Sequence, residues 1–343
     1  MNVKPLLDAL GLQEDAARTM ADDLRTQIEE LHGRLRGHRR KSLTSGDRAA
    51  TARAIRLDHR WRRRPLGPAG SRAVSTTVYG ATMSFVLPDG LPPGRFLSSG
   101  PARVWVSDEF PQDVDQLWPR LLSEQKDRRL VPLLCWPDAL GRPLGLDHVD
   151  AVRLEEVLAT DFAEYRRRRL PFWTDPTPAP APEGVEPWPH DPGPPFEQWP
   201  GLAPQMPAAS ADPKPEEAAA SLLSWFIETG RFGLDECRLM LVPARRGSDA
   251  LASIGWSAEA PLPLLCALLR SWEDRFGARI VAVFGSELHV SVARPPVEAE
   301  HANLLALEHV LSTANNIIDD PPTPFPEYAM DLVGRTRWSF WWD

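Results

Sequence analysis

Apolar and polar positions follow their most regular pattern in residues 216–343. Short apolar runs predict buried strands at 238–242 and 250–256. Apolar positions spaced by three and four then predict a helix over 262–276, and Gly277 stands where a left-handed residue ends a helix. This part of the chain is therefore expected to be a folded domain.

A hairpin, two helices and a last strand are predicted after Gly277. Two strands, 279–284 and 287–293, flank the two-residue turn Gly285-Ser286. The remaining elements are a helix from Pro296 to Ser312, a helix over 326–333 and a strand over 337–342. This order predicts an α+β fold, with an antiparallel or mixed sheet and helices packed on one face.

Four further segments precede this C-terminal domain. Residues 1–36 carry one apolar stripe at helical spacing and predict an amphipathic helix. Residues 37–82 are basic, then rich in Gly, Ser and Thr, and are expected to be disordered. Residues 83–170 predict a smaller N-terminal α/β region, and residues 171–215 form a proline-rich connector. The predicted elements of the α/β region are strands at 103–106 and 130–136 and a helix over 150–169.

The connector has an unusual composition, since fifteen of its forty-five residues are proline. Such a stretch favours extended, semi-rigid geometry over helix or sheet. It also contains Trp173, Trp188, Phe196 and Trp199, which a plain spacer does not need. We therefore expect parts of it, residues 195–200 above all, to lie against a folded surface.

Overall charge and composition limit the class of protein. The 343 residues are 43% hydrophobic and 25% charged, with a net charge of −8, which is ordinary for a folded protein. No apolar run approaches the roughly 18 residues of a membrane span. The N-terminal residues also lack a secretory signal pattern. Three cysteines, far apart and outside any CxxC, favour a reducing compartment, so we expect a cytoplasmic protein without membrane contact.

Short catalytic motifs are missing. The sequence contains no GxxxxGK[ST], no GxGxxG after a strand, no GxSxG, no HExxH and no paired CxxC. These absences count against the common nucleotide, hydrolase and zinc classes. We predict no cofactor and no metal site.

Candidate site residues remain on three elements. On the strand 287–293, alternation places Glu287 and His289 on one face. These residues are either part of a solvent-exposed surface, which is the favoured interpretation, or part of a functional site. Glu273 lies in a charged stretch of the helix 262–276, in which Arg270 and Asp274 are one turn apart and are expected to pair.

The aromatic C-terminus supplies further candidates. Alternation puts Trp338, Phe340 and Trp342 on one face, which we expect to be buried. Trp341 and Asp343 lie on the opposite face and, with Trp256, are candidates for contact with a ligand or a partner protein.

His301, Glu308 and His309 share or border one face of the helix 296–312. This set suits metal ligation or an acid–base pair, whereas the plainer interpretation is a solvated helix face. The plainer interpretation is favoured.

Several runs together resemble a known family, the bacterial domain-of-unknown-function family DUF4253, whose members are common in actinobacteria. The residues that carry the resemblance are 239–251, Gly255-Trp256, 270–279 and 338–343. The resemblance covers about 216–343, and more weakly 84–200, but not residues 1–82. It implies a domain and no activity. Relatives often carry an Asn- and Thr-bearing loop at the position that follows Trp256 here, and a Phe-Cys-Pro-Asp-Asn run near the end of the long helix. This sequence departs from both patterns, and only Asn315 or Asn316 is retained from them.

Three functions follow as hypotheses. The first is a non-catalytic protein- or ligand-binding module of an immunity-type or regulatory kind, because aromatic residues are favoured at binding centres. The second is an enzyme with a site between the two folded halves that uses His289, Glu287 or Glu273. The third is nucleic-acid association through residues 34–64, where twelve Lys or Arg face two acids; a basic linker is preferred there. The sequence leaves the oligomeric state open.

Overall fold

The computed structural model describes residues 74–78, 81–99, 102–136, 139–177, 189–209, 212–230, 233–234, 236–256, 258–318 and 323–343. All of them belong to one compact unit, Gly70–Asp343. The predicted helix 1–36 and the basic run 34–64 lie outside these residues.

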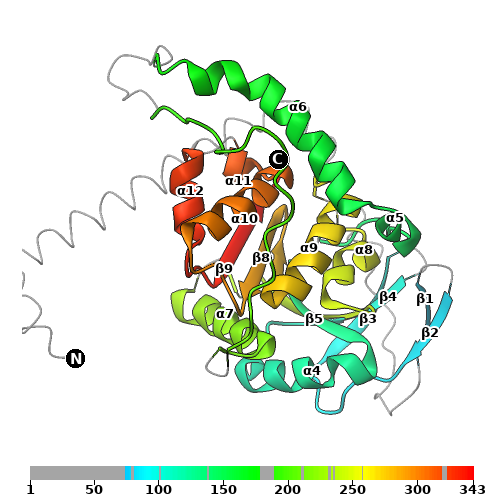
Figure 1. Cartoon of the computed structure of the whole chain (residues 1–343). Coiled ribbons are helices and arrows are strands. Elements are labelled where there is room, and N and C mark those ends of the chain that lie inside the picture. Colours follow the sequence, from blue (N-terminus) through cyan, green and yellow to red (C-terminus); the bar gives the residue numbers. More distant parts are fainter. Residues whose placement is uncertain are drawn as a thin grey trace, which may run out of the picture. The chain divides into compact units, whose positions relative to one another are not determined.

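A seven-stranded sheet is the centre of the described part (Figure 1). The strands β5 (Leu130–Cys135) and β7 (Ala278–Phe284) are parallel to each other, and all other neighbouring strands are antiparallel. In spatial order the strands are β3 (Gly94–Ser99), β4 (Ala102–Ser107), β6 (Arg238–Pro243), β5 (Leu130–Cys135), β7 (Ala278–Phe284), β8 (Glu287–Val292) and β9 (Arg337–Trp341). The α+β class and the mostly antiparallel sheet are thus confirmed.

Strands from the two predicted folded regions interleave in this sheet. β5 comes from the region 83–170 but pairs with β6 on one side and with β7 on the other. The two regions therefore share one sheet and are not two separate domains. Farther toward the N-terminus, β1 (Val74–Val78) and β2 (Ala81–Phe85) form a separate antiparallel pair, so the expected disorder of 37–82 does not hold for its last residues.

Helices cover both faces of the sheet, because its strands are apolar on both sides. In β6, Met240 packs into one core, whereas Leu239 and Leu241 pack into the other. We call these the α9 core and the α7 core, after the helices α9 (Leu262–Phe276) and α7 (Pro215–Thr229) that pack on them. The α7 core is covered by α4 (Val114–Arg128) and α7 (Pro215–Thr229). The other helices are α5 (Leu146–Asp150), α6 (Leu154–Thr174), α8 (Ala250–Ile254), α9 (Leu262–Phe276), α10 (Ala299–Leu311), α11 (Asn315–Ile318) and α12 (Phe325–Leu332).

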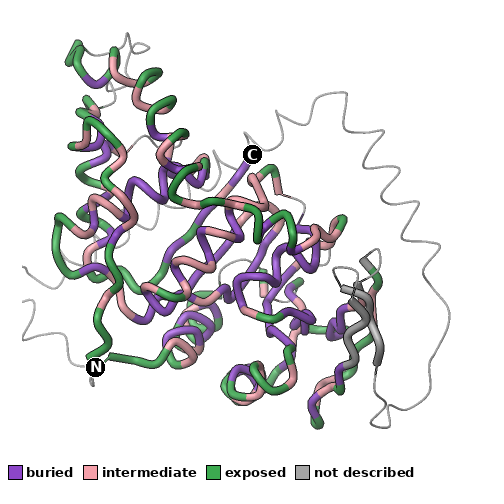
Figure 2. Tube along the Cα trace, turned by 45° about the vertical axis from the view of Figure 1, so that its right-hand side comes forward, coloured by how far each residue is buried: buried purple, intermediate pink, exposed green. Residues whose placement is uncertain are grey.

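Packing on two faces departs from the predicted single helical face. β5 shows the reason, since all six of its residues are buried and it lacks the alternation of a one-sided strand. Figure 2 shows the buried residues concentrated in the middle of the described part, with exposed residues on the outer turns of the helices. In the described part of the chain, no helix combines the length and the apolar character that a membrane crossing needs.

The C-terminal elements agree closely with the predicted ones. The helix 262–276, its end at Gly277 with φ +63°, and the hairpin around Gly285-Ser286 are confirmed. The alternation of the last strand is also confirmed, since Trp338, Phe340 and Trp342 are buried.

One predicted strand is wrong. Residues 250–256 form the helix α8 after a short 3₁₀ turn, η1 (Gly247–Asp249). In a short run that is apolar throughout, polar and apolar positions do not alternate with a period that distinguishes a strand from a helix. The chain ends this helix at Gly255, whose φ of +58° lets the backbone turn toward Trp256.

Replacement of Gly255 by alanine is expected to destabilise the protein by about 2 kcal/mol. An alanine in the left-handed conformation costs about 1 kcal/mol. Its Cβ atom would also lie 2.0 Å from the backbone C and O of Arg142, and this steric overlap adds about 1 kcal/mol. Gly230→Ala is the matched control, since Gly230 has φ +59° and open space around it. Urea-denaturation midpoints measure both variants. Equal losses in the two would contradict the predicted clash.

The second half of the connector lies on the fold, as predicted. Residues 189–209, which we call the strap, follow α6 along the chain, and Phe196 and Trp199 of the strap pack against the α9 core. The ring of Trp199 lies 6.5 Å from that of Phe162 on α6. The first residues of the connector, through Thr174, instead complete α6.

Candidate functional site

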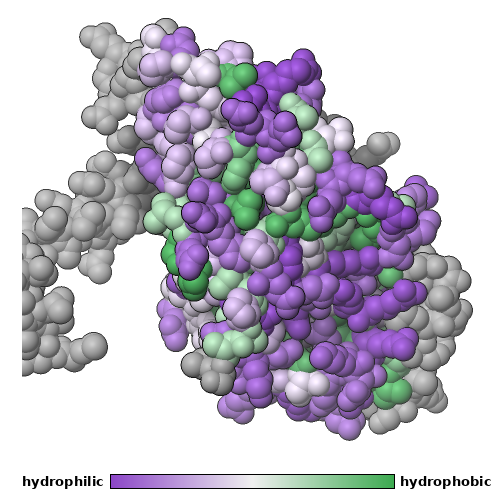
Figure 3. Space-filling view, in the orientation of Figure 1, coloured by the Kyte–Doolittle hydropathy of each residue, from purple (hydrophilic) through white to green (hydrophobic). Residues whose placement is uncertain are grey.

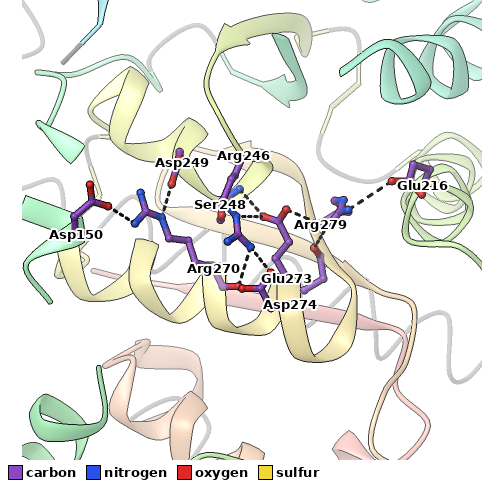
Figure 4. Close-up of polar contacts among 10 residues, drawn as sticks. Asp150, Glu216, Arg246, Ser248, Asp249, Arg270, Glu273, Asp274 and Arg279 are labelled. Carbon is purple, nitrogen blue, oxygen red and sulfur yellow. Dashed lines mark hydrogen bonds and ion pairs between the residues drawn. The ribbon is translucent and has the colours of Figure 1, made fainter. Parts of the chain in front are cut away.

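A charged cluster joins α9 to the loop that follows β6 (Figure 4). β6 ends at Pro243, and the chain then turns over the C-terminal half of α9 through η1. This turn brings side chains from five parts of the chain together. The members of the cluster are Asp150, Glu216, Arg246, Ser248, Asp249, Arg270, Glu273, Asp274 and Arg279.

Arg270 binds two carboxylates from other elements. Its Nε donates to Asp249 Oδ1 and its Nη1 donates to Asp150 Oδ1, both at 2.6 Å. Burial opposes the charge of Arg270, but these hydrogen bonds outweigh it, so the pKa of Arg270 lies above its ordinary value. The predicted pair of Arg270 with Asp274 is wrong. Asp274 instead accepts a hydrogen bond of 2.6 Å from Arg246 Nη2, because the tertiary fold offers each group a closer partner.

Glu273 is held by three groups. Its Oε2 accepts from the backbone N–H of Ser248 at 3.2 Å and lies 3.7 Å from Arg246 Nε. Its Oε1 lies 3.4 Å from Arg279 Nη1. Both carboxylate oxygens are thus engaged, and the side chain ties η1 to β7 and α9. The Oγ of Ser248 is buried and has no hydrogen-bond partner in the described part of the chain.

Glu287 and His289 lie together, but under a helix. Their Oε2 and Nε2 atoms are 3.4 Å apart. The ring of His289 is almost fully buried, 5.3 Å from the ring of Phe226 on α7 and 5.4 Å from that of Phe284. The wet-surface interpretation is therefore wrong for His289, because α7 covers this face of β8.

Trp256, Trp341 and Asp343 gather around the end of β9. The indole N–H of Trp256 donates to Gly285 O at 2.9 Å, and its ring meets that of Trp342 edge-on at 5.6 Å. The backbone N–H groups of Trp341 and Asp343 donate to the side chains of asparagines of α11. The six predicted site residues thus fall in three separate places: Glu273 in the charged cluster, Glu287 and His289 under α7, and these three residues at the C-terminus.

Asn315 and Asn316 act on the backbone of the last strand. Asn316 Oδ1 accepts from Trp341 N–H at 2.7 Å, and its Nδ2 donates to Ser339 O at 3.0 Å. Asn315 Oδ1 accepts from the N–H of Asp343 at 3.1 Å. The Asn316 amide therefore satisfies backbone groups on the outer edge of β9, which an edge strand otherwise leaves open.

Glu308 is fully buried and paired, which the sequence did not predict. Glu308 of α10 accepts from Arg275 Nη1 at 2.8 Å and Nη2 at 2.5 Å, from Trp272 Nε1 at 2.8 Å and from the strap residue Ala203 at 2.8 Å. The solvated-face interpretation is therefore wrong for Glu308. Its signal in the sequence was an acid inside the run 304–311, in which His309 is the only other polar residue.

His309 is also fully buried and contacts Tyr328 of α12, with its Nδ1 2.9 Å from the Tyr328 hydroxyl. Its ring lies 4.6 Å from that of Trp338 and 4.9 Å from that of Trp272. Burial, and then the positive charges of Arg335 and Arg275, hold the pKa of His309 well below its usual value. The described residues contain no group of three His, Cys, Asp or Glu side chains arranged to hold a metal ion.

Three cations line an open hollow beside the charged cluster. Its described lining residues are Lys126, Arg129 and Arg245, and its volume is about 530 Å³. Lys126 is in the last turn of α4, Arg129 follows that helix, and Arg245 follows β6. We call this the cationic hollow. Within the described residues none of the three has an acidic partner within 4.0 Å. Sequence reasoning missed the group because Arg245 is more than a hundred residues away from Lys126 and Arg129.

Comparison with known proteins gives one match. Residues 238–343 match the model of a domain of unknown function (DUF4253). No curated protein and no solved structure matches the chain. β5 lies outside the matched residues and yet separates β6 from β7, so the sheet of the matched part is completed by residues 130–135. The resemblance to DUF4253 that the sequence suggested is thus confirmed over residues 238–343.

Proposed function

We propose that this protein is a non-catalytic binding module that recognises an anionic partner at the cationic hollow. The observation that carries the proposal is the gathering of Lys126, Arg129 and Arg245 around one hollow whose described lining holds no acid. Like charges brought together in this way repel one another, and an anion relieves that repulsion. An immunity-type or regulatory role belongs to the same class of binding function.

The state of the other polar side chains supports a function without chemistry. A general acid or base must come within hydrogen-bond reach of its substrate. Both oxygens of Glu273 are engaged, and His289 lies behind two phenylalanine rings. Glu308 is bound by Arg275 and is inaccessible to solvent. These residues stabilise the fold, so that binding would involve other, exposed side chains. Figure 3 shows hydrophilic side chains gathered on the surface over the region of α4 and α9.

The proposal includes a reducing, cytoplasmic location. Cys135, Cys237 and Cys266 are free and buried. Burial raises the pKa of Cys266 to about 12, so this thiol stays protonated and unreactive. The nucleic-acid alternative concerns residues 34–64, outside the described residues, and stays a prediction.

Binding of labelled polyglutamate to the full chain tests the proposal, with polylysine as the opposite-charge probe. The triple variant Lys126→Gln, Arg129→Gly, Arg245→Gln is expected to bind polyglutamate at least about tenfold more weakly, since each charge-assisted hydrogen bond contributes about 1.5–3 kcal/mol. The basic run 34–64 is present in both proteins and contributes equally to both. Arg142→Gln, at an exposed arginine outside the hollow, is the matched control. Equal polyglutamate affinity of the parent protein and the triple variant would refute the proposal.

A further inference from the structure

We propose that the cationic hollow is a phosphate site, which takes free phosphate or the phosphate group of a small phosphorylated ligand. This inference rests on the proposed function, because it names the anion that the hollow recognises.

Backbone pairing holds two of the three cations, Arg129 and Arg245, on neighbouring segments. Leu130 at the start of β5 is in register with Pro243 at the end of β6. One residue outside this pair, the N–H of Ala244 donates to Arg129 O at 3.0 Å. Arg129 and Arg245 are therefore held on adjacent chain segments by the sheet itself. A site whose cations are positioned by backbone hydrogen bonds needs little rearrangement to bind an anion.

Arg129 has a backbone conformation that glycine adopts more cheaply. Its φ is +54°, and it stands at the left-handed position that ends α4, with its N–H donating to Gln125 O at 2.7 Å. Glycine is the usual residue there, because a side chain in this conformation costs about 1–2 kcal/mol. The exposed side chain of Arg129 has no partner within the described part of the chain that would offset this cost. Strain of this kind is concentrated at functional sites.

The charges that surround the cationic hollow do not explain why its three cations lie together. Cations near the end of a helix offset its partial negative charge, and Lys126 contributes to that effect at the end of α4. Arg128 is in the same turn and already pairs with Glu124. Arg245 comes from a different element, so the helix end does not explain its presence. Its neighbour Arg246 is bound to Asp274, which leaves Arg245 as the cation of that loop facing the hollow.

The donor chemistry suits a phosphate better than a carboxylate. A phosphate monoester carries about −1.5 to −2 charges at neutral pH and has three strong acceptor oxygens. A carboxylate has one charge and two oxygens, and it would leave the repulsion among three cations largely in place. Two guanidinium groups can each bind two phosphate oxygens, while the lysine ammonium acts as a point charge. The hollow offers this combination of two arginines and one lysine.

Isothermal titration of the full chain with inorganic phosphate, at constant ionic strength and with acetate as the comparison anion, tests the inference. We expect saturable phosphate binding that exceeds acetate binding, and we expect Arg129→Gly and Arg245→Gln each to weaken it at least about tenfold. Arg129→Gly should keep or raise the melting temperature, since it relieves the left-handed strain, so a loss of binding cannot be ascribed to unfolding. Arg142→Gln should leave binding unchanged. A second arm with phosphoserine distinguishes a phosphate monoester from the free anion by which of the two binds more tightly.

Two results would overturn the inference. Absence of saturable phosphate binding is one, and equal phosphate affinity of the parent chain, Arg129→Gly and Arg245→Gln is the other. If polyglutamate binding still depends on the hollow in either case, the phosphate site is wrong and the binding function stands. Loss of hollow-dependent binding for both probes refutes the two proposals together.

Discussion

Replacement of Glu308 by alanine is expected to destabilise the protein by about 3–5 kcal/mol, because it leaves a mostly buried guanidinium without its counter-charge. Arg275 donates two hydrogen bonds to this carboxylate, and Trp272 donates a third. The strap loses a contact as well, since the N–H of Ala203 is bound to the same carboxylate. Chemical denaturation followed by tryptophan fluorescence measures the loss.

Two further variants separate charge from shape. Glu308→Gln keeps the volume and one acceptor oxygen and should cost less than Glu308→Ala. The double variant Glu308→Leu, Arg275→Met removes both charges and should recover part of the stability, as apolar replacement of a buried pair often does. Glu164→Ala is the surface control, since Glu164 pairs with Arg167 in an exposed position and such pairs contribute about 0–1 kcal/mol. A cost of Glu308→Ala no larger than that of the control would contradict a structural role for the buried pair.

Stability is expected to fall as the pH drops below about 6.5, the ordinary pKa of histidine, through His309. The folded state keeps His309 neutral because burial, together with the positive charges of Arg335 and Arg275, lowers its pKa well below the ordinary value. The unfolded chain takes up a proton at this residue below pH 6.5, whereas the folded chain does not. The stability that His309 contributes is therefore fully present above pH 6.5 and is lost as the pH falls toward the folded pKa, at about 1.4 kcal/mol per pH unit.

The comparison with His309→Gln isolates this residue from the carboxylates that also titrate in acid. Free energies of unfolding at pH 7.0 and at pH 4.5 should differ more in the parent protein than in the variant, by up to about 2.7 kcal/mol, which is the full effect of two pH units below 6.5. Glutamine can keep a hydrogen bond with the Tyr328 hydroxyl, so the variant should remain folded. The same pH dependence in both proteins would show that His309 does not remain neutral in the folded state.

Local patterns predicted the C-terminal elements well, and they failed where a pattern had no period. The stripe of the helix 262–276 and the hairpin at Gly285-Ser286 have strong local signals, and both are present as expected. The run 250–256 is apolar at nearly every position, so strand and helix were equally compatible with it. The packing of residues 195–200 on the fold was predictable because aromatic residues in a proline-rich stretch need a surface.

Candidate chemistry was harder to predict than the fold. Sequence reasoning selected Glu273, Glu287 and His289 as single residues, but their partners come from other elements. Arg246 and Arg279 hold Glu273, and Phe226 of α7 covers His289. No spacing along the chain indicates such partners.

Sequence patterns were enough to predict the α+β class, most element boundaries after residue 261, and the burial of alternate aromatic residues in the last strand. These properties depend on residues that are close together in the sequence, within about one or two helical turns. At that range, hydrophobic periodicity and the choice of turn residues determine the local structure. Three other properties became visible only in the folded chain: β5 separates β6 from β7, Glu308 is a buried anion, and one hollow is lined by Lys126, Arg129 and Arg245. Each of these joins residues that are far apart in the chain. Such pairings are selected by the burial and hydrogen bonding of the whole fold, which no local pattern encodes.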